Sequence, residues 1–293
     1  MAGWEQKIQA GPLLLDGAMG TMLMAEGLTG GDCPESYNLT HPRVLAGIAR
    51  KYRLAGCDIV QTNTFGASPI KLAKYRLDDR IDTIITAAVR MAREGADGKT
   101  LVCGSCGPCG DLLRPYGQRE PGEVLDGFRV QMALLAREEV DLLHIETMSD
   151  LREAVLALQA AREISPQIPV LVSLTFNPSP RGFFTLMGDD IPTVIRTLTE
   201  KGAQGIGSNC GNGSDQMVSI AREIRKHSTL PIVIQPNAGL PRLQSGRTVY
   251  PETPGYMARK AREMLKAGVN ILGGCCGTTP AHMSAIAKVI DEY

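Results

Sequence analysis

The chain has 293 residues, 43% hydrophobic and 21% charged, and its 31 basic and 31 acidic residues give a formal net charge of zero. This composition is that of a globular protein. Without net charge, no chain-wide field attracts nucleic acid or an anionic membrane surface, and no uninterrupted run of 18 apolar residues could span a bilayer. Because the first residues also lack the apolar run of a signal peptide, we expect a cytoplasmic protein whose eight cysteines are reduced.

Short apolar runs alternate with longer amphipathic stretches along the chain. Runs that are apolar throughout predict strands buried on both faces, and they cover residues 12–18, 58–65, 101–107, 141–147, 170–176, 205–211, 231–237 and 270–276. Helical periodicity, often opened by an N-cap residue or proline and closed by glycine, covers residues 41–56, 80–95, 121–139, 150–164, 191–202, 214–227, 253–268 and 279–293. The longest loops are predicted at residues 177–190 and 243–252.

Eight strand-then-helix units in this length predict an α/β fold, a (β/α)8 TIM barrel that forms a single domain over residues 1–293. A doubly wound open sheet is the alternative, but no G-x-G-x-x-G pattern follows the first predicted strand. In such barrels the chemistry lies where the strands end. Polar or cysteine side chains occur at these strand ends, namely Asp16, Asn63, Glu146, Cys210, Asn237, Cys275 and Cys276.

Three of these strand-end residues are cysteines, and two of the three are adjacent. Cys275 and Cys276 lie in GGCCG, and Cys210 lies in SNCGNG at the end of another predicted strand. Three thiolates leave one position of a tetrahedral zinc open, which distinguishes a catalytic zinc site from a structural one. The alternative is that they are small apolar core residues. A disulfide between adjacent residues would be strained, so we favour a metal site.

The remaining cysteines and histidines favour packing roles. Cys103, Cys106 and Cys109 have C-x2-C-x2-C spacing, as in some iron–sulfur proteins, but the proline–cysteine context of that motif is missing. We therefore expect Cys103 in the barrel wall and Cys106 near the mouth, while Cys33 and Cys57 are interpreted as structural. No metal-binding histidine motif occurs; His144 is predicted in the core and His282 on the surface of the last helix.

Several motifs together resemble a known family. They are DGAMGT (16–21), QTNTFGA (61–67), GPCGDLLRPYG (107–117), IET (145–147), SNCGNG (208–213), NAGLP (237–241) and GGCCGTTPAH (273–282). With them the chain resembles the homocysteine S-methyltransferase family, and in particular the homocysteine-binding module of cobalamin-dependent methionine synthase. The likeness extends from about residue 12 to residue 290.

The resemblance implies a zinc-dependent barrel and a role for each matching residue. Cys210, Cys275 and Cys276 match the zinc-binding, catalytic cysteines, and Asn237 matches a residue that occupies the fourth zinc position before the substrate arrives. Asp16 and Glu146 match acidic residues near the substrate amino group. The remaining matches are the backbone N–H groups of Gly17, Ala18 and Met19, which form a carboxylate-binding turn, and the mouth residues Asn63, Thr64 and Asn209.

By this resemblance the protein activates homocysteine as a thiolate and methylates it to methionine. The sequence has no D-x-H-x-x-G, the signature of the cobalamin module, and we expect no separate cobalamin or folate domain. The expected donor is therefore methylcobalamin on a separate corrinoid protein. Alternatives are S-methylmethionine, S-adenosylmethionine or betaine as donor, a zinc thiol-binding or corrinoid-assembly subunit without turnover, and a redox protein built on the C-x2-C-x2-C pattern.

Overall fold

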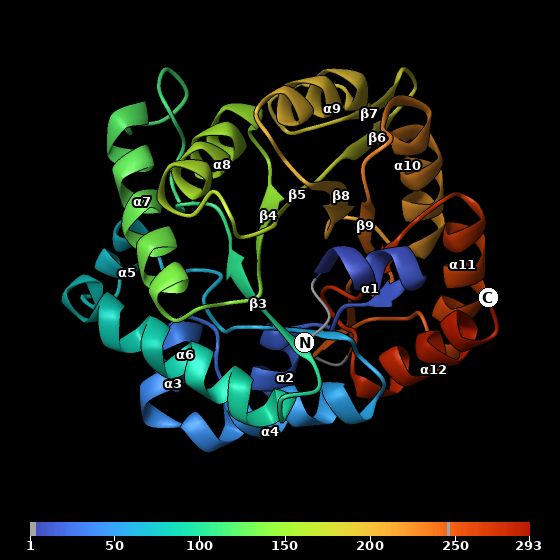
Figure 1. Cartoon of the computed structure of the whole chain (residues 1–293), viewed down its shortest axis with the longest axis horizontal. Helices are drawn as coiled ribbons and strands as arrows, with labels where there is room; N and C mark the ends of the chain where they lie inside the picture. Colours follow the sequence, from blue (N-terminus) through green and yellow to red (C-terminus); the bar gives the residue numbers. More distant parts are fainter. Residues whose placement is uncertain (1–3, 245–246) are drawn as a thin grey trace.

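Eight parallel strands form a closed ring at the centre of the molecule (Figure 1). The computed structural model describes residues 4–244 and 247–293. In their order around the ring, the strands are β1 (Leu13–Leu14), β12 (Ile271–Leu272), β9 (Ile232–Gln235), β8 (Gly205–Asn209), β5 (Val170–Leu174), β4 (Leu142–Met148), β3 (Leu101–Cys106) and β2 (Ile59–Gln61). A parallel bridge between Leu15 and Ile59 joins the two ends of this sheet. The prediction of a (β/α)8 barrel is therefore confirmed.

One helix follows each barrel strand and packs on the outside of the ring (Figure 1). In chain order these helices are α4 (Pro42–Leu54), α6 (Ile81–Ala96), α7 (Pro121–Arg137), α8 (Leu151–Ile164), α9 (Ile191–Glu200), α10 (Ser214–His227), α11 (Pro254–Lys266) and α12 (Pro280–Asp291). Each lies within the predicted helical stretch or close to its bounds. The shorter helices are α1 (Trp4–Ala10), α2 (Met19–Ala25), η1 (Pro34–Ser36), α3 (Tyr37–Thr40), α5 (Pro69–Ala73) and η2 (Asp78–Arg80).

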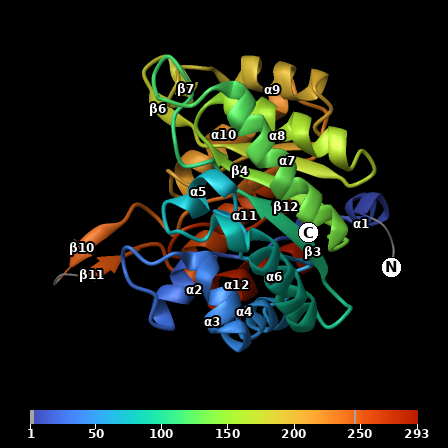
Figure 2. The ribbon, with the colours of Figure 1, turned by 90° about the vertical axis from the view of Figure 1, so that its left-hand side faces the viewer.

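The two long predicted loops each contain a short antiparallel hairpin. Strands β6 (Asn177–Ser179) and β7 (Gly182–Phe184) pair in the first loop, and β10 (Arg242–Gln244) and β11 (Arg247–Val249) pair in the second. Both hairpins lie on the side of the molecule opposite α1, and β10–β11 projects from the body (Figure 2). The hairpins therefore flank the carboxyl ends of the barrel strands.

The helices begin where side chains satisfy their first backbone N–H groups. Asp150 accepts a hydrogen bond from Arg152 N at 2.8 Å at the start of α8, and Asp190 accepts one from Thr193 N at 2.9 Å at the start of α9. Proline occupies the first turn of most of the barrel helices, where no N–H is needed and its fixed φ suits the helix. These local signals explain why the helix starts can be predicted from sequence.

The alternation of side chains along the strands produces two separate apolar cores. Leu13 and Leu15 point into the barrel with the first residues of other strands, whereas Leu14 joins the larger core between strands and helices. Trp4 of α1 belongs to the inner core and is 8% exposed. In Figure 1, α1 lies across the middle of the ring. Helix α1 thus covers the amino-terminal end of the barrel, so the opposite end is left for a binding site.

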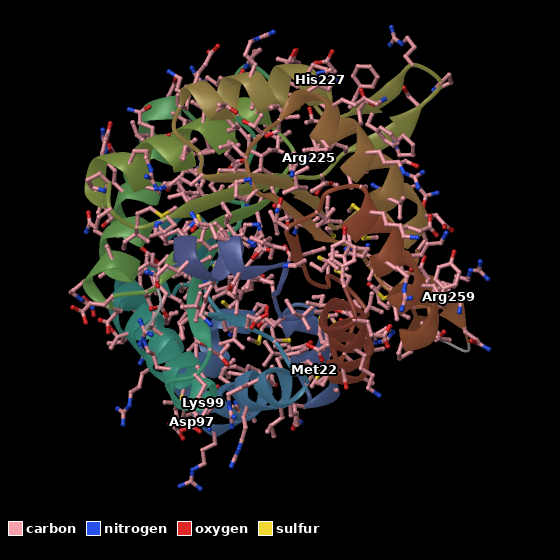
Figure 3. All side chains as sticks on the ribbon, turned by 45° about the vertical axis from the view of Figure 1, so that its right-hand side comes forward. Met22, Asp97, Lys99, Arg225, His227 and Arg259 are labelled. Carbon is pink, nitrogen blue, oxygen red and sulfur yellow. The ribbon has the colours of Figure 1, made fainter. Side chains whose placement is uncertain are left out.

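Charged side chains lie mainly on the outside of the helical layer. Lys99 and Arg259, for example, point away from the ribbon (Figure 3). In the part of the chain that the structure describes, no helix combines the length and apolarity needed to cross a membrane. The cytoplasmic location stays a prediction.

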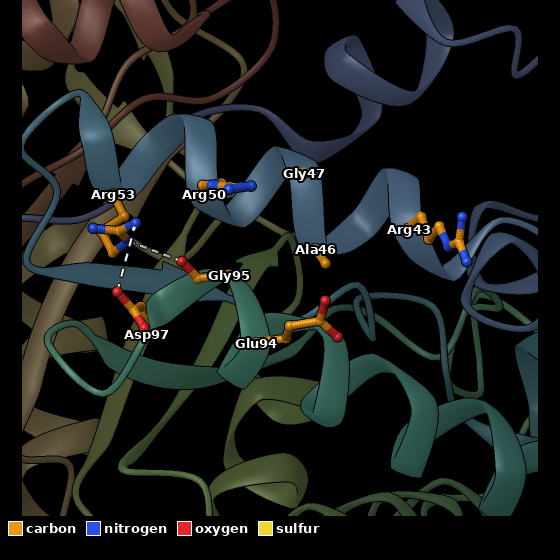
Figure 4. A pocket seen from close by; sticks show the side chains of 8 residues that line it. All are labelled: Arg43, Ala46, Gly47, Arg50, Arg53, Glu94, Gly95 and Asp97. Atoms are coloured by element: carbon orange, nitrogen blue, oxygen red, sulfur yellow. Dashed lines mark hydrogen bonds and ion pairs between the residues drawn. The ribbon is translucent and has the colours of Figure 1, made fainter.

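A groove of about 410 Å³ runs between α4 and α6 on the outer wall (Figure 4). Arg53 crosses it, donating to Gly95 O at 3.0 Å and lying 3.9 Å from the Asp97 carboxylate. The helices touch where Gly95 has no side chain, because a Cβ there would lie 2.5 Å from Ala49 Cβ and 2.6 Å from Ala46 O. None of the residues that line this groove also lines the cavity at the carboxyl ends of the barrel strands, which is described below. We interpret the groove as a consequence of helix packing.

Replacing each of two glycines in this groove by alanine should have different effects on the free energy of unfolding. Gly95→Ala forces α4 and α6 apart, and overpacking costs about 1–3 kcal/mol, more than the gain of about 1 kcal/mol in helix propensity. Gly47→Ala meets no atom within 4 Å and should keep that gain. We expect urea denaturation to show a lower free energy of unfolding for Gly95→Ala and an equal or higher one for Gly47→Ala. Equal effects would contradict the close packing at Gly95.

Candidate active site and metal centre

A cavity of about 260 Å³ opens among the carboxyl ends of the barrel strands. Of the residues that we predicted for the site, those that line it are Gly17, Ala18, Met19, Asn63, Glu146, Cys210, Cys275 and Cys276. The four other predicted residues, Asp16, Thr64, Asn209 and Asn237, are buried and do not line the cavity. Asp16, Asn209 and Asn237 lie behind the residues that line the cavity. Thr64 instead donates from its hydroxyl to Ser105 O at 2.7 Å and holds the wall together.

Cys210 projects from a sharp turn directly after β8. Its φ is +60° and that of Gly211 is +70°, so the chain leaves the strand through two left-handed residues in succession. Cys210 N donates to Gln235 O of β9 at 3.2 Å, and Asn212 N donates to Cys210 O at 2.8 Å. The backbone therefore fixes the direction of the Cys210 side chain before any metal is considered.

The Cys275–Cys276 turn is held by two backbone hydrogen bonds to the segment that follows β9. Cys275 N donates to Pro236 O at 2.8 Å, and Ala238 N donates to Cys276 O at 2.9 Å. Gly277 closes the turn at a φ of +82°, and a Cβ there would lie 2.1 Å from the Tyr250 ring. Only glycine suits that position, both in conformation and in space.

These two turns bring three sulfurs together. The Sγ atoms of Cys210 and Cys276 are 3.9 Å apart, and the Sγ atoms of Cys210, Cys275 and Cys276 all lie within 4.8 Å of one another. Within residues 4–244 and 247–293, no other group of three or more Cys, His, Asp or Glu side chains is close enough to share a metal ion. Hydrogen bonds from Cys275 and Cys276 lower the pKa of Cys210 well below that of a free thiol, while the pKa values of Cys275 and Cys276 are raised. The cluster is thus arranged around a negative charge.

Asn237 lies beside this cluster. Its backbone N–H donates to Asn212 O at 3.0 Å, and its side-chain amide is close enough to Cys210 to contribute to the lowered pKa of that thiol. Its Oδ1 is buried and accepts no hydrogen bond from the described residues. A buried carbonyl oxygen without a donor is unfavourable, and a metal ion held by the three sulfurs would supply the missing partner.

The other cysteines do not form a second cluster. Cys103 and Cys106 lie three residues apart on β3 and therefore face opposite sides of the sheet. Cys103 packs in the inner core and Cys106 in the outer core, where its Sγ donates to Gln131 Oε1 at 3.5 Å. This arrangement contradicts an iron–sulfur site. Cys33 and Cys57 are buried, as expected for structural residues.

Two buried carboxylates lie at another wall of the cavity, which Glu146 lines and behind which Asp16 is buried. Asp16 is 1% exposed; its Oδ2 accepts from Gln61 N at 2.8 Å, and its Oδ1 has no partner among the described residues. Glu146 Oε1 accepts from Gln61 Nε2 at 2.5 Å and from Ser105 Oγ at 2.6 Å. Burial is the main cause that raises the pKa of Asp16 to about 8 and that of Glu146 to about 7. None of the described residues that line the cavity is Lys, Arg or His.

Asn209 holds Glu146 in place from the next strand but one. Its Nδ2 donates to Glu146 Oε2 at 3.2 Å and to Thr147 Oγ1 at 2.7 Å, and its Oδ1 accepts from Thr147 N at 2.7 Å. Thr147 has a φ of +59°, which is rare for a β-branched residue, and the register of β4 shifts between Ile145 and Met148. The bulge turns Glu146 toward the cavity, and Asn209 stabilises the strained backbone next to it.

The DGAMGT turn forms another part of the wall. Ala18 N already donates to Thr278 Oγ1 at 3.0 Å, so the Gly17 and Met19 N–H groups are left as candidates to hold an anion. A Cβ on Gly17 would lie 2.7 Å from Thr278 Oγ1 and 2.9 Å from Tyr52 Oη. The absence of a side chain at Gly17 is thus explained by these neighbours, whatever the cavity binds.

Several residues that line the cavity were not predicted from the sequence. Gln61, Ser105 and Gln235 line the cavity, and each is a polar residue at the carboxyl end of an apolar strand, which is the signal that could have identified them. Glu35 also lines it, accepting from Gly66 N at 2.6 Å. Its position in a long irregular segment gave no such signal.

One predicted position was wrong. His282 is not on the surface of α12; it is 8% exposed and belongs to a capping box at the start of that helix. Its Nδ1 accepts from Thr279 N at 3.2 Å, and its Nε2 lies 3.0 Å from Glu252 O. Capping geometry, with the side chain folded back over the first turn, explains its burial. His144, as predicted, lies in the core, where burial lowers its pKa to about 3.

The model of homocysteine S-methyltransferases matches residues 13–290. The chain belongs to this family. It is 33% identical over 303 aligned residues to methionine synthase of Mycobacterium tuberculosis, covering 98% of this chain and 25% of that protein. It is 34% identical over 292 aligned residues to methionine synthase of Mycobacterium leprae, covering 94% of this chain and 24% of that protein. The chain thus spans about a quarter of the length of these relatives.

Solved structures with the same fold include other methyltransferases. The homocysteine methyltransferase MmuM from Escherichia coli in its metallated form aligns with a TM-score of 0.79 at 24% identity, covering 97% of this chain and 98% of that chain. A methyltransferase from Methanosarcina mazei aligns with a TM-score of 0.62 at 11% identity, covering 96% of this chain and 94% of that one. At these identities the structural likeness supports the fold of this family member.

The buried carboxylates predict how the stability of this family member depends on pH. In the folded state, burial raises the pKa of Asp16 from 3.8 to about 8, so the folded chain keeps a proton that the unfolded chain releases. The free energy of unfolding should therefore fall as the pH rises from about 4 to about 8, by at most about 1.4 kcal/mol per pH unit for each such group. Asp16→Asn should flatten this slope and stabilise the ligand-free protein at pH 8.

Urea denaturation between pH 5 and pH 8 measures this slope. Asp97→Asn, which changes an exposed carboxylate on the outer wall, is the control and should keep the wild-type slope. If Asp16→Asn and wild type lose stability equally over this range, Asp16 does not hold a proton in the folded state.

Proposed function

We propose that the protein binds homocysteine and transfers a methyl group to its sulfur, forming methionine, with a zinc ion held by Cys210, Cys275 and Cys276. The carrying observation is that one small cavity has three clustered sulfurs on one wall and Glu146 on another, with the Asp16 carboxylate buried behind that second wall. Homocysteine has the complementary groups, because its thiol suits the sulfur cluster and its ammonium suits the carboxylates. The family to which the chain belongs supports this substrate.

The donor set of the cluster suits zinc. Zinc is commonly bound by thiolates, and three protein ligands leave one coordination position for substrate. Asn237 Oδ1, which lacks a partner among the described residues, is the protein group placed to occupy that position before homocysteine binds. When bound, zinc would lower the pKa of the substrate thiol and hold its sulfur as a nucleophilic thiolate.

The protein's own residues would hold the amino-acid end of homocysteine. Asp16 and Glu146 would bind the ammonium, and the substrate's positive charge would favour the ionised form of both carboxylates, which burial now disfavours. The Gly17 and Met19 N–H groups would receive the substrate carboxylate. Asn209 would keep Glu146 oriented, and Asn63, tied to Pro34 O at 2.8 Å, would shape the wall.

The methyl donor that we propose is methylcobalamin carried by a separate corrinoid protein that docks at the barrel mouth. The curated relatives are methionine synthases, of whose length this chain spans about a quarter. Large apolar side chains are also exposed on segments that follow the barrel strands, as on a docking surface. They are Met24, Tyr75, Leu112, Tyr116, Leu186, Leu240, Leu243 and Val249.

A betaine donor is less well supported by the cavity. Recognition of a quaternary ammonium group commonly uses a cage of aromatic side chains. Among the described residues that line the cavity, Phe65 is the one aromatic side chain. S-methylmethionine and S-adenosylmethionine remain as alternative donors, and a donor assay separates them.

Metal content provides the first test. We expect the wild-type protein, purified under reducing conditions and supplied with zinc, to bind about one equivalent by elemental analysis, while Cys210→Ala and Cys276→Ser lose most of it. Both variants should retain the barrel by circular dichroism, since the turns are held by backbone hydrogen bonds. Cys33→Ser, outside the cluster, should bind zinc like wild type. Full zinc content in Cys210→Ala would refute the metal assignment.

A donor screen provides the second test. Zinc-loaded protein is incubated with homocysteine and, separately, methylcobalamin free or on a corrinoid protein, S-methylmethionine, S-adenosylmethionine and betaine, and methionine is measured. We expect turnover with the corrinoid donor and at least a hundredfold less in Cys276→Ser. Turnover with S-methylmethionine but none with methylcobalamin would replace the proposed donor. No methionine from any donor, despite zinc and homocysteine binding, would favour a non-catalytic thiol-binding subunit.

A further inference from the structure

Gln61 donates hydrogen bonds to both buried carboxylates, and its sequence motif does not explain this role. It is the last residue of β2, it is 8% exposed and it lines the cavity. Its backbone N–H donates to Asp16 Oδ2 at 2.8 Å, and its side-chain Nε2 donates to Glu146 Oε1 at 2.5 Å. The two carboxylates come from β1 and β4, so Gln61 is the residue that ties them together.

The orientation of the Gln61 amide is fixed by a second glutamine. Gln235 Nε2 donates to Gln61 Oε1 at 3.3 Å. A flipped Gln61 amide would turn its oxygen toward the Glu146 carboxylate in place of the Nε2 that now donates to it, so Glu146 and Gln235 together favour the observed orientation. Gln235 also accepts from Cys210 N through its backbone carbonyl at 3.2 Å. A continuous set of contacts therefore joins Cys210, Gln235, Gln61 and Glu146.

We propose that Gln61, oriented by Gln235, is a positioning residue that holds Glu146 toward the substrate ammonium and thereby sets the preference of the site for amino-bearing thiols. This inference rests on the proposed function and deepens it. Gln61 acts through Glu146 and does not itself take part in methyl transfer.

The remaining contacts of Glu146 explain why the Gln61 amide matters. Without it, Glu146 keeps hydrogen bonds from Ser105 Oγ and Asn209 Nδ2. A carboxylate that loses one of three donors in a buried site is less favoured in its ionised form and less fixed in direction. The contact from Gln61 N to Asp16 is a backbone contact, so a side-chain substitution should leave it in place.

The test compares two thiols that differ in the amino group alone. Homocysteine and 4-sulfanylbutanoate, its analogue without the ammonium, are titrated into zinc-loaded protein by isothermal titration calorimetry. We expect wild type to prefer homocysteine, and Gln61→Met to reduce that preference by about tenfold, the size expected for a hydrogen bond to a charged group. The affinity for 4-sulfanylbutanoate should change little, since that thiol makes no use of Glu146.

A matched control and a second variant make the outcomes decisive. Gln131→Met removes another buried glutamine, whose Nε2 donates to Thr64 O at 2.8 Å outside the cavity, and it should leave the preference unchanged. Gln235→Met, which keeps Gln61 but removes its orienting donor, should reduce the preference in the same direction. If circular dichroism shows that Gln61→Met does not fold, Gln235→Met provides the test.

The results also separate this inference from the function on which it rests. The positioning role would be overturned if Gln61→Met weakened the binding of both thiols equally. It would also be overturned if both glutamine variants kept the wild-type preference for homocysteine. Neither result would contradict homocysteine binding itself. Failure of the zinc-loaded wild type to bind either thiol would overturn the proposed function, and this inference with it.

Discussion

The contact between β1 and β2 closes the barrel with few hydrogen bonds. The whole candidate site depends on this closure. Asp58 N donates to Leu14 O at 2.7 Å, and Asp16 N donates to Ile59 O at 3.0 Å. Asp16 therefore joins β1 to β2 through its backbone, while its carboxylate is buried behind the cavity wall and accepts from Gln61 N. With the ring closed, turns that are distant in sequence meet at one end, because the carboxyl ends of all parallel strands lie on the same side.

The site combines groups that destabilise the fold. The carboxylates of Asp16 and Glu146 are buried, and Thr147 has a strained backbone beside Glu146. Such features reduce stability and persist where function needs them. The apolar cores on both faces of the sheet supply the stability that a preformed site of this kind requires.

The sequence predicted the fold well because its signals are local. Apolar runs, N-cap residues and prolines at helix starts placed every barrel helix close to its observed bounds. Strands β1 and β12 are only two residues long, since residues after them leave the sheet to build the turns at Asp16 and Cys275. The strand-end cysteines were found because of their unusual pairing. Gln61, at the end of an apolar strand, and His282, three residues after the helix start at Thr279, also had local signals, but their contacts with Glu146 and Glu252 are tertiary and no local pattern contains them.

Gly274 N donates to Asp16 O at 3.0 Å, so the turn that carries Cys275 and Cys276 is bound directly to the end of β1. The main chain thus sets the separation between the sulfur cluster and the Asp16 carboxylate. In the proposed complex, the length of a thiol's carbon chain would then decide whether its sulfur and its ammonium can be bound at the same time.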